Sequence, residues 1–263
     1  MKKLVSLTLI GLMVIVAGCG GEANSNSTDG STTDGGDDGA AKEKGKPWDP
    51  ALGTATASGV VKFSGKPPRR RAIDMAAKAE CAKLHGEPVL DESIIVNEDG
   101  TLKNVMVWVK RGLKGWDFPV PDEPVVLNQK GCLFHPHVQG VQLGQQVTIR
   151  NSDSFGHNVH SFSTLNPDFN FGQPTQGQED NKVFDYKEFI RFKCDIHGWM
   201  SSHLAVIPHP YFAVTGDDGK FELAKLPPGE YTIEAWHEEL GTQSEKVTVE
   251  DGKEVTIEFT FED

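Results

Sequence analysis

Cysteine, histidine and methionine fall close together in one short stretch of this chain. The stretch from Cys194 to Met200 also contains His197, so it places a thiol, an imidazole and a thioether within seven residues. A second imidazole, that of His157, lies upstream. Two His, one Cys and one weak axial Met form the ligand set of a type 1 copper site, whose chemistry is one-electron transfer. We therefore predict one copper ion with His157, Cys194, His197 and Met200 as its ligands.

Zinc is the rival metal for this set of side chains. It accepts Cys and His readily, but a structural zinc site normally has four strong ligands, for which Met is a poor match. Under that alternative Asp195 would complete the site. Soft thiolate and thioether ligands select Cu(I) while imidazole also suits Cu(II), so the mixed set favours copper.

The first residues predict an exported protein. Lys2 and Lys3 precede an apolar run from Leu4 to Val16, which is too short to span a bilayer and is typical of a signal peptide. The sequence Val-Ala-Gly-Cys that ends at Cys19 resembles a bacterial lipobox, which implies cleavage before Cys19 and diacylation of its thiol. The alternative is an ordinary cleaved signal with a stray cysteine.

These features predict the location of the protein. We expect residues 1–18 to be the signal peptide and residues 19–46 to be a flexible linker, because Gly, Ser, Thr, Asp and Ala dominate there and cannot bury a core. A lipid on Cys19 would hold the protein to a membrane surface without spanning it. The expected location is the cell envelope, as a periplasmic or cell-surface lipoprotein.

Composition and motifs also narrow the function classes. The formal net charge of −12 argues against a nucleic-acid partner and leaves a basic or neutral protein partner open. The sequence contains no Gly-x-Ser-x-Gly, no His-Glu-x-x-His and no phosphate-binding glycine loop. We therefore expect no hydrolase, and the electron-carrier interpretation of the metal motif predicts a protein that is not an enzyme.

The four cysteines predict one disulfide. With Cys19 acylated and Cys194 in the metal motif, Cys81 and Cys132 remain, and an exported chain lies in an oxidising compartment. We predict that these two pair. The alternative is that Cys132 belongs to a second metal site together with His135 and His137, which follow it closely.

Short runs of β-branched and aromatic residues, separated by Gly, Pro, Asn and Asp, predict an all-β fold. The one expected helix lies near residues 75–84, where Ala and Lys are dense. Strands this short, recurring with turn signals, are typical of β-sandwiches. The expected strands lie at 60–63, 93–96, 105–109, 146–150, 212–215, 220–223, 230–237, 246–250 and 254–261.

Residues 124–208 resemble a complete cupredoxin. The resemblance rests on the order of three features, which are the run from Phe134 to Asp153, the triplet His157-Asn158-Val159 and the late ligand loop. The spacing Cys-x₂-His-x₂-Met is that of the amicyanin-like members with a short loop. The resemblance implies a Greek-key sandwich and a role for Asn158 in fastening the two ligand segments by hydrogen bonding. Because ligand histidines usually need the second ring nitrogen satisfied or exposed, an exposed edge of His197 would be the natural electron port.

The flanking segments resemble a different family, the carboxypeptidase regulatory-like (transthyretin-like) sandwiches. The similarity lies in the run from Phe221 to Ala235 and in the run from Gly59 to Pro67. Neither flank has enough strands alone, so we expect residues 47–123 and 209–263 to form a second small β-sandwich into which the cupredoxin is inserted. The alternative is an extended cupredoxin from about residue 55, followed by a separate C-terminal β module.

Together these observations predict a lipid-anchored copper protein that carries single electrons and meets a redox partner protein. One alternative is a protein that binds copper to store, deliver or sense it. Another is a copper enzyme with a small-molecule substrate, for which His135 and His137 remain unassigned. The chain has five Met and only Met200 lies near the cluster, which favours the carrier over a Met-rich delivery protein.

Overall fold

The computed structural model describes residues 45–262, which lie in one compact unit. The expected all-β fold is confirmed, because strands make up almost all the regular structure of this part of the chain. The expected signal peptide, Cys19 and all but the last two residues of the expected linker lie outside the described residues. Within residues 45–262 there is no helix with the length and apolar character needed to cross a membrane.

The expected helix is reduced to one short turn, α1 (Ala79–Ala82), and a 3₁₀ turn η1 covers Pro50–Leu52. The strands are β1 (Lys46–Pro47), β2 (Ala55–Ser64), β3 (Met106–Arg111), β4 (Trp116–Asp117), β5 (Val125–Lys130), β6 (Leu133–His135), β7 (Val138–Gln142), β8 (Val147–Asn151), β9 (His157–Phe162), β10 (Asn170–Gln173), β11 (Glu179–Lys182), β12 (Glu188–Lys193), β13 (Ser201–Ile207), β14 (Phe212–Val214), β15 (Lys220–Leu226), β16 (Gly229–His237), β17 (Gly241–Val249) and β18 (Glu254–Glu262).

The first sandwich is built from residues 125–207. A five-stranded sheet in the order β10-β9-β12-β13-β7 supplies one layer, and a four-stranded sheet in the order β11-β8-β5-β6 supplies the other. Strands β5 and β8 pair in parallel, as do β7 and β13, so the chain must cross between them. Alternating apolar side chains of both sheets fill the core, including Leu127, Phe134, Ile149, Phe192 and Leu204.

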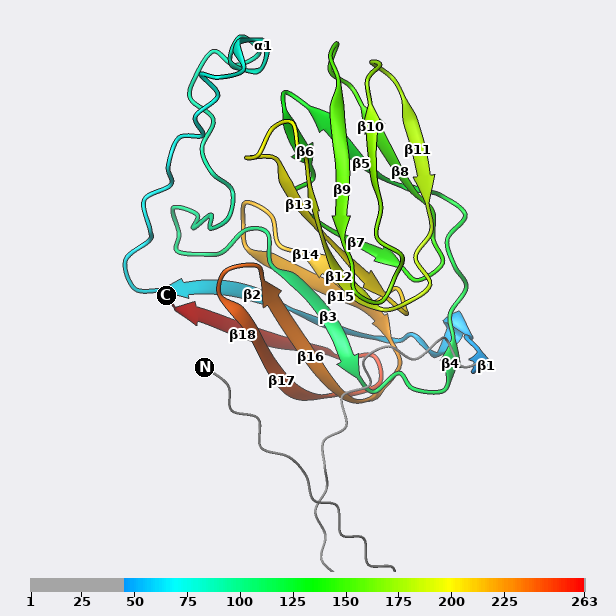
Figure 1. Cartoon of the computed structure of the whole chain (residues 1–263). Helices are drawn as coiled ribbons and strands as arrows, with labels where there is room; N and C mark the ends of the chain where they lie inside the picture. Colours follow the sequence, from blue (N-terminus) through cyan, green and yellow to red (C-terminus); the bar gives the residue numbers. More distant parts are fainter. Residues whose placement is uncertain (1–44, 263) are drawn as a thin grey trace, which may run out of the picture. The chain divides into compact units, whose positions relative to one another are not determined.

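The second sandwich combines segments far apart in the sequence. Strand β2 lies between β15 and β18, and strand β3 lies between β14 and β16, with β17 beyond β16. Figure 1 shows the cyan β2 beside the red β18. The pairings between the early segment and the C-terminal tail, on which an inserted cupredoxin depends, are therefore present. Val61, Leu102, Val107, Ile233 and Phe259 lie in its core.

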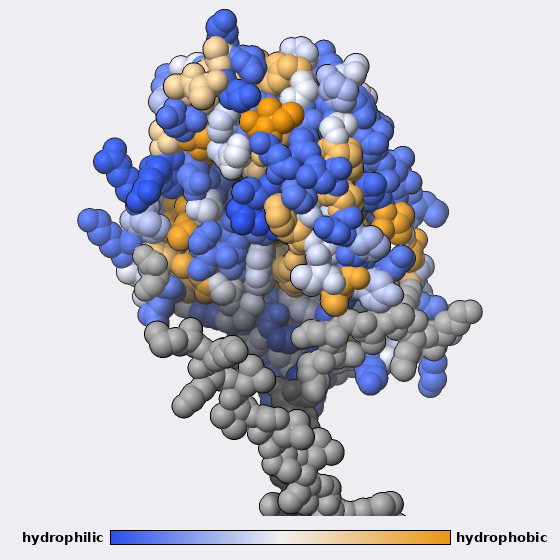
Figure 2. Space-filling view, in the orientation of Figure 1, coloured by the Kyte–Doolittle hydropathy of each residue, from blue (hydrophilic) through white to orange (hydrophobic). Residues whose placement is uncertain are grey.

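A third apolar cluster joins the two sandwiches. Met106 and Trp108 of β3 pack with Ala205 and Ile207 of β13. Glycine is needed at position 140, because the ring of Phe212 packs against its backbone and a Cβ there would lie 2.4 Å from ring atoms. Elsewhere the surface is solvated, and Figure 2 shows a face on which hydrophilic residues predominate and apolar ones are scattered.

The connection between β2 and β3 leaves the second sandwich and packs against the first. Met75 and Cys81 of this connection belong to the core cluster of the first sandwich. A disulfide joins Cys81 to Cys132 at the β5–β6 turn, as predicted, with an S–S distance of 2.03 Å. The strand expected at 93–96 is reduced to a single bridge between Val96 and Leu102, because the chain turns back at once through residues 97–100.

Candidate metal centre

Two segments of the first sandwich bring the predicted ligands together. His157 is the first residue of β9, and Cys194 follows β12 directly. The turn from Cys194 to Met200 connects β12 with β13, which pair with each other. Backbone hydrogen bonds close this turn, from the N–H of Cys194 to the carbonyl of Met200 at 3.3 Å and from the N–H of Met200 to the carbonyl of His197 at 2.9 Å. The ligand loop is thus held at both ends by paired strands.

Three donor atoms converge in this place. The Nδ1 atoms of His157 and His197 lie 3.1 Å apart, and the Sγ of Cys194 lies 3.6 Å from Nδ1 of His197. All three ligand atoms lie within 4.8 Å of one another. Each of the three residues is at most 1% exposed, and Met200 is fully buried in the same apolar cluster as Cys194. Two imidazoles and a thiol in a shared buried space fit the donor preference of copper.

Asp153 orients the ring of His157. The Nε2 of His157 lies 2.8 Å from Oδ2 of Asp153, and this carboxylate is 6% exposed. Because an ionised carboxylate only accepts hydrogen bonds, Nε2 carries a hydrogen, and Nδ1 is the ring nitrogen that faces Cys194 and His197. Carboxylate partners of this kind fix the tautomer and orientation of metal-binding histidines.

The turn between β5 and β6 fixes the carboxylate of Asp153 by hydrogen bonds. The backbone N–H groups of Gly131 and Cys132 donate to the Asp153 carboxylate at 2.7 and 2.9 Å. Both residues have positive φ, at 65° and 56°, which turns the two N–H groups in one direction. Burial alone would raise the pKa of Asp153, but the hydrogen bonds from His157 and from these two backbone groups outweigh it and lower the pKa.

Cys194 lies in surroundings that stabilise its thiolate. Burial alone would raise the pKa of the thiol, but the hydrogen bond from His157 and the backbone N–H groups of Asn158, His197 and Ile196 outweigh it and lower the pKa. A metal-binding thiol must lose its proton, so this environment favours binding. The N–H of Asn158 lies 3.4 Å from the Cys194 sulfur.

Asn158 also links the two ligand segments directly. Its side-chain Oδ1 accepts a hydrogen bond at 2.8 Å from the backbone N–H of Asp195 in the ligand loop. The same residue therefore holds the sulfur with its backbone and the loop with its side chain.

His197 has no exposed edge that could serve as an electron port. His197 is 1% exposed, and its Nε2 has no hydrogen-bond partner among the described residues. Its ring packs against Phe155 and Trp199, and one ring nitrogen lies within 4.8 Å of both sulfurs of the Cys81–Cys132 disulfide. Burial and the charge of His157 lower the pKa of His197 to about 4, so the ring is neutral at pH 7, as a ligand must be.

The alternative roles given to neighbouring residues do not fit the structure. The disulfide removes Cys132 from any second metal site. His135 is exposed and approaches the carbonyl of Lys130, so it does not share a site with His137. Asp195 points to the surface, where its carboxylate lies 3.2 Å from Nδ1 of His160, so it does not complete a zinc site.

Two features were missed in the sequence. Asp153 precedes His157 by four residues in the turn before β9, and that spacing was a usable signal for an orienting carboxylate. The other feature is Glu238, which lies between His137 and His203 with its Oε2 2.9 Å from Nε2 of His203 and its Oε1 in hydrogen-bond contact with Nε2 of His137. No sequence spacing connects these three residues, since the fold alone brings the β16–β17 turn to the first sandwich.

Comparison with known proteins identifies part of the chain. Residues 206–262 match the carboxypeptidase regulatory-like domain family. This match covers the last strands of the second sandwich and less than half of the chain. No curated protein matches the sequence.

Solved structures similar to this chain include copper proteins. A Cu-containing nitrite reductase from Thermus scotoductus SA-01 is 23% identical over 38% of this chain and 25% of its own length, with a TM-score of 0.29. The chain thus spans about a quarter of that enzyme. A mutant of amicyanin in its Cu(I) form is 20% identical over 33% of this chain and 85% of its own, with a TM-score of 0.29. A purple cupredoxin from Nitrosopumilus maritimus is 21% identical over 32% of this chain and 99% of its own, with a TM-score of 0.28.

Proposed function

We propose that this protein carries single electrons at a type 1 copper site and is held by a lipid at the cell envelope. The observation that carries the proposal is the buried convergence of Nδ1 of His157, Nδ1 of His197 and Sγ of Cys194, with Met200 in the same apolar cluster. Copper bound there would supply a one-electron couple. The surrounding residues would orient the ligands and enclose the site.

The scaffold supports electron transfer because it holds the donors in one arrangement. His157 is fixed by Asp153, and Cys194 is fixed by the N–H of Asn158. The ligand loop is closed by its own backbone hydrogen bonds and anchored by β12 and β13. Donors that cannot move far do not reorganise when the oxidation state changes, and small reorganisation is what rapid electron transfer needs.

Burial of the site favours a carrier over a copper-delivery protein. The three strong donors are at most 1% exposed, and Phe155, Trp199 and the disulfide surround His197. A protein that hands its metal to a partner needs ligands that the partner's ligands reach. Here the exchange of copper would require the cover to open, whereas the exchange of electrons would not.

The location at the cell envelope rests on the sequence before residue 45. The apolar leader, the lipobox-like Val-Ala-Gly-Cys and the polar stretch that follows support a tethered, exported protein. The Cys81–Cys132 disulfide fits an oxidising compartment. Electron exchange with a redox partner protein at the membrane surface follows from that location.

Spectroscopy of the copper-loaded protein tests the proposal. We expect an intense thiolate-to-copper absorption band in the visible region and a narrow copper hyperfine splitting. Cys194→Ser should abolish the band while the far-ultraviolet circular dichroism of the β-sandwiches stays unchanged. Asp195→Asn is a matched control in the same loop and should keep the band. A colourless wild-type protein that retains tightly bound zinc would refute the proposal, and rapid copper loss during voltammetry would favour delivery.

A further inference from the structure

The closed edge of His197 means that electrons must reach this site by another surface. The ring of His197 is enclosed by Phe155, Trp199 and the disulfide, and its Nε2 meets no polar partner in the described part of the chain. Of the residues that cover the ring, Phe155 and Trp199 are both half-buried and so also contact solvent, and the ring of Trp199 lies closer to that of His197, with centroids 5.4 Å apart against 6.3 Å. A surface on which a redox partner docks would therefore lie beside Trp199.

Trp199 connects the ligand His197 to the outside. The two ring centroids are 5.4 Å apart. The indole Nε1 donates a hydrogen bond at 3.0 Å to the carbonyl of Cys132, which fixes the ring in place. An aromatic ring in contact with a ligand ring on one side and with solvent on the other is a short path for an electron.

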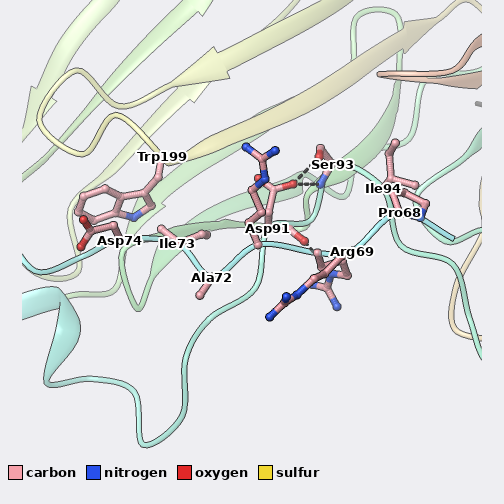
Figure 3. A pocket seen from close by; sticks show the side chains of 11 residues that line it. Pro68, Arg69, Ala72, Ile73, Asp74, Asp91, Ser93, Ile94 and Trp199 are labelled. Atoms are coloured by element: carbon pink, nitrogen blue, oxygen red, sulfur yellow. Dashed lines mark hydrogen bonds between the residues drawn. The ribbon is translucent and has the colours of Figure 1, made fainter.

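The outer side of Trp199 forms one end of a groove. The groove has a volume of about 500 Å³, within the range of binding sites in proteins. Its walls are the extended segments 68–74 and 91–94, and the nearby bridge between Ala72 and Leu90 holds these two parts of the chain together. Figure 3 shows Trp199 beside Asp74 at one end and Pro68 beside Ile94 at the other.

Charge distinguishes this groove from the rest of the protein. Three consecutive arginines, Arg69, Arg70 and Arg71, line it together with Asp74 and Asp91, which gives three positive against two negative charges in a chain of net charge −12. Arg70 is used internally, since its guanidinium donates to the carbonyls of Asp91 and Leu90.

The two flanking arginines are available to a partner. Arg69 and Arg71 are exposed, and their guanidinium groups make no ion pair or hydrogen bond with other described residues, although the backbone carbonyl of Arg71 accepts from the N–H of Asp91. The two aspartates are already engaged locally, because Asp91 accepts from the N–H of Ser93 and Asp74 accepts from the N–H of Ala76. Unpaired guanidinium groups beside an electron path recognise carboxylates.

We propose that this groove is the docking site for a redox partner protein that presents a carboxylate-rich surface, and that Trp199 is the electron port. The proposal rests on the proposed function, since it assumes a one-electron copper site. One electron leaves the site and the docked partner gains one electron, or the reverse, and neither atoms nor protons are transferred. Local positive charge in an acidic protein would orient the partner and select against other contacts.

Anion binding to the copper-free protein tests the docking surface without any redox reaction. The probe is hexacyanocobaltate(III), a redox-inert trianion, titrated into the full chain while the indole N–H signal of Trp199 is followed by NMR and assigned with Trp199→Phe. We expect a saturable shift of that signal. Arg69→Gln/Arg71→Gln should weaken binding about tenfold, as expected for two lost charge contacts.

The control variant Arg150→Gln/Arg191→Gln removes the same net charge from residues that do not line the groove. It should change binding by less than about twofold, because exposed charges away from a site are largely screened. An unshifted Trp199 signal, or equal weakening in both double variants, would overturn the docking surface.

Electron-transfer rates test the port. Reduced, copper-loaded protein is mixed with hexacyanoferrate(III), which gains one electron, or with the cation tris(phenanthroline)cobalt(III), which also gains one. Arg69→Gln/Arg71→Gln should slow only the anionic oxidant, by about fivefold or more. Trp199→Leu should slow both oxidants relative to Trp199→Phe, and unchanged rates would overturn the port. If the visible band never forms, the proposed function fails, whereas the anion-binding result remains valid.

Discussion

The hydrogen bonds around Asp153 make a sharp prediction for the variant Asp153→Asn. In the wild type, Oδ1 accepts from the N–H of Gly131, and Oδ2 accepts from the N–H of Cys132 and from Nε2 of His157. An amide has one acceptor oxygen and one N–H₂ group with two donor hydrogens, so one of these two oxygen positions must become a donor. The less costly orientation places the N–H₂ against Gly131, which keeps His157 held.

That orientation loses one hydrogen bond to a charged group and leaves a buried N–H facing another donor. We expect the copper-free protein to lose about 2–3 kcal/mol of unfolding free energy, measured by urea denaturation near pH 7. Copper affinity should fall by about tenfold or more, because the partner that orients His157 is now neutral. The control Asp217→Asn removes an exposed carboxylate paired with Lys103 and should cost less than about 0.5 kcal/mol.

The pH dependence gives a second readout for the same variant. The pKa of Asp153 is lowered in the folded state, so its stabilisation is present above the unfolded value of about 3.9 and is lost as the pH falls through the folded pKa. The difference in stability between wild type and Asp153→Asn should therefore be full at pH 7 and shrink below about pH 4. A variant as stable and as tight in copper binding as the Asp217→Asn control would show that the carboxylate does not orient His157.

Two further predictions concern the contacts of Glu238 and the disulfide. Glu238→Gln should destabilise the protein at pH 6 and less at pH 9. The hydrogen bond that His137 donates to Glu238 raises the pKa of His137 despite burial, so the stabilisation is complete below pH about 6.5 and is lost as the pH rises through the raised value. Urea midpoints at the two pH values measure this, and equal losses at both would contradict it. Cys81→Ala/Cys132→Ala opens a loop with a sequence separation of 51 and should lower the unfolding free energy by about 4 kcal/mol, read from thermal or urea unfolding with the reduced wild type as control.

The sequence was sufficient to predict the fold class and part of the strand content. Alternating apolar residues and turn signals place most of the expected strands within a few residues of observed bounds, as for β16 and β18, whereas β9 and β12 beside the candidate ligands were not among them. The disulfide followed from counting thiols, and the combination of early and C-terminal strands in one sandwich followed from two half-sets of strands that could not form a sandwich alone.

What could not be predicted depends on packing between distant segments. The cover over His197 arises because the connection between β2 and β3 folds onto the first sandwich and is bonded to it at Cys132. The contact of Glu238 with His203 depends on how the β16–β17 turn meets β13. Neither arrangement produces a pattern in the sequence. Each depends on how distant strands and turns pack together, and not on the spacing of residues within one strand or turn.

The inserted topology has a consequence for the order in which the protein can fold. Residues 125–207 are contiguous and contain all the strands of the first sandwich, so they can pair soon after they are made. Strand β2 must wait for its partner β18, since Thr56 pairs with Glu254 and Ser64 with Glu262. Until then a ten-residue strand with apolar side chains keeps open edges, and such edges recruit other chains. Contacts this distant in sequence also form slowly. The first sandwich would therefore finish early, while the second remains exposed to aggregation until the last strand of the chain arrives.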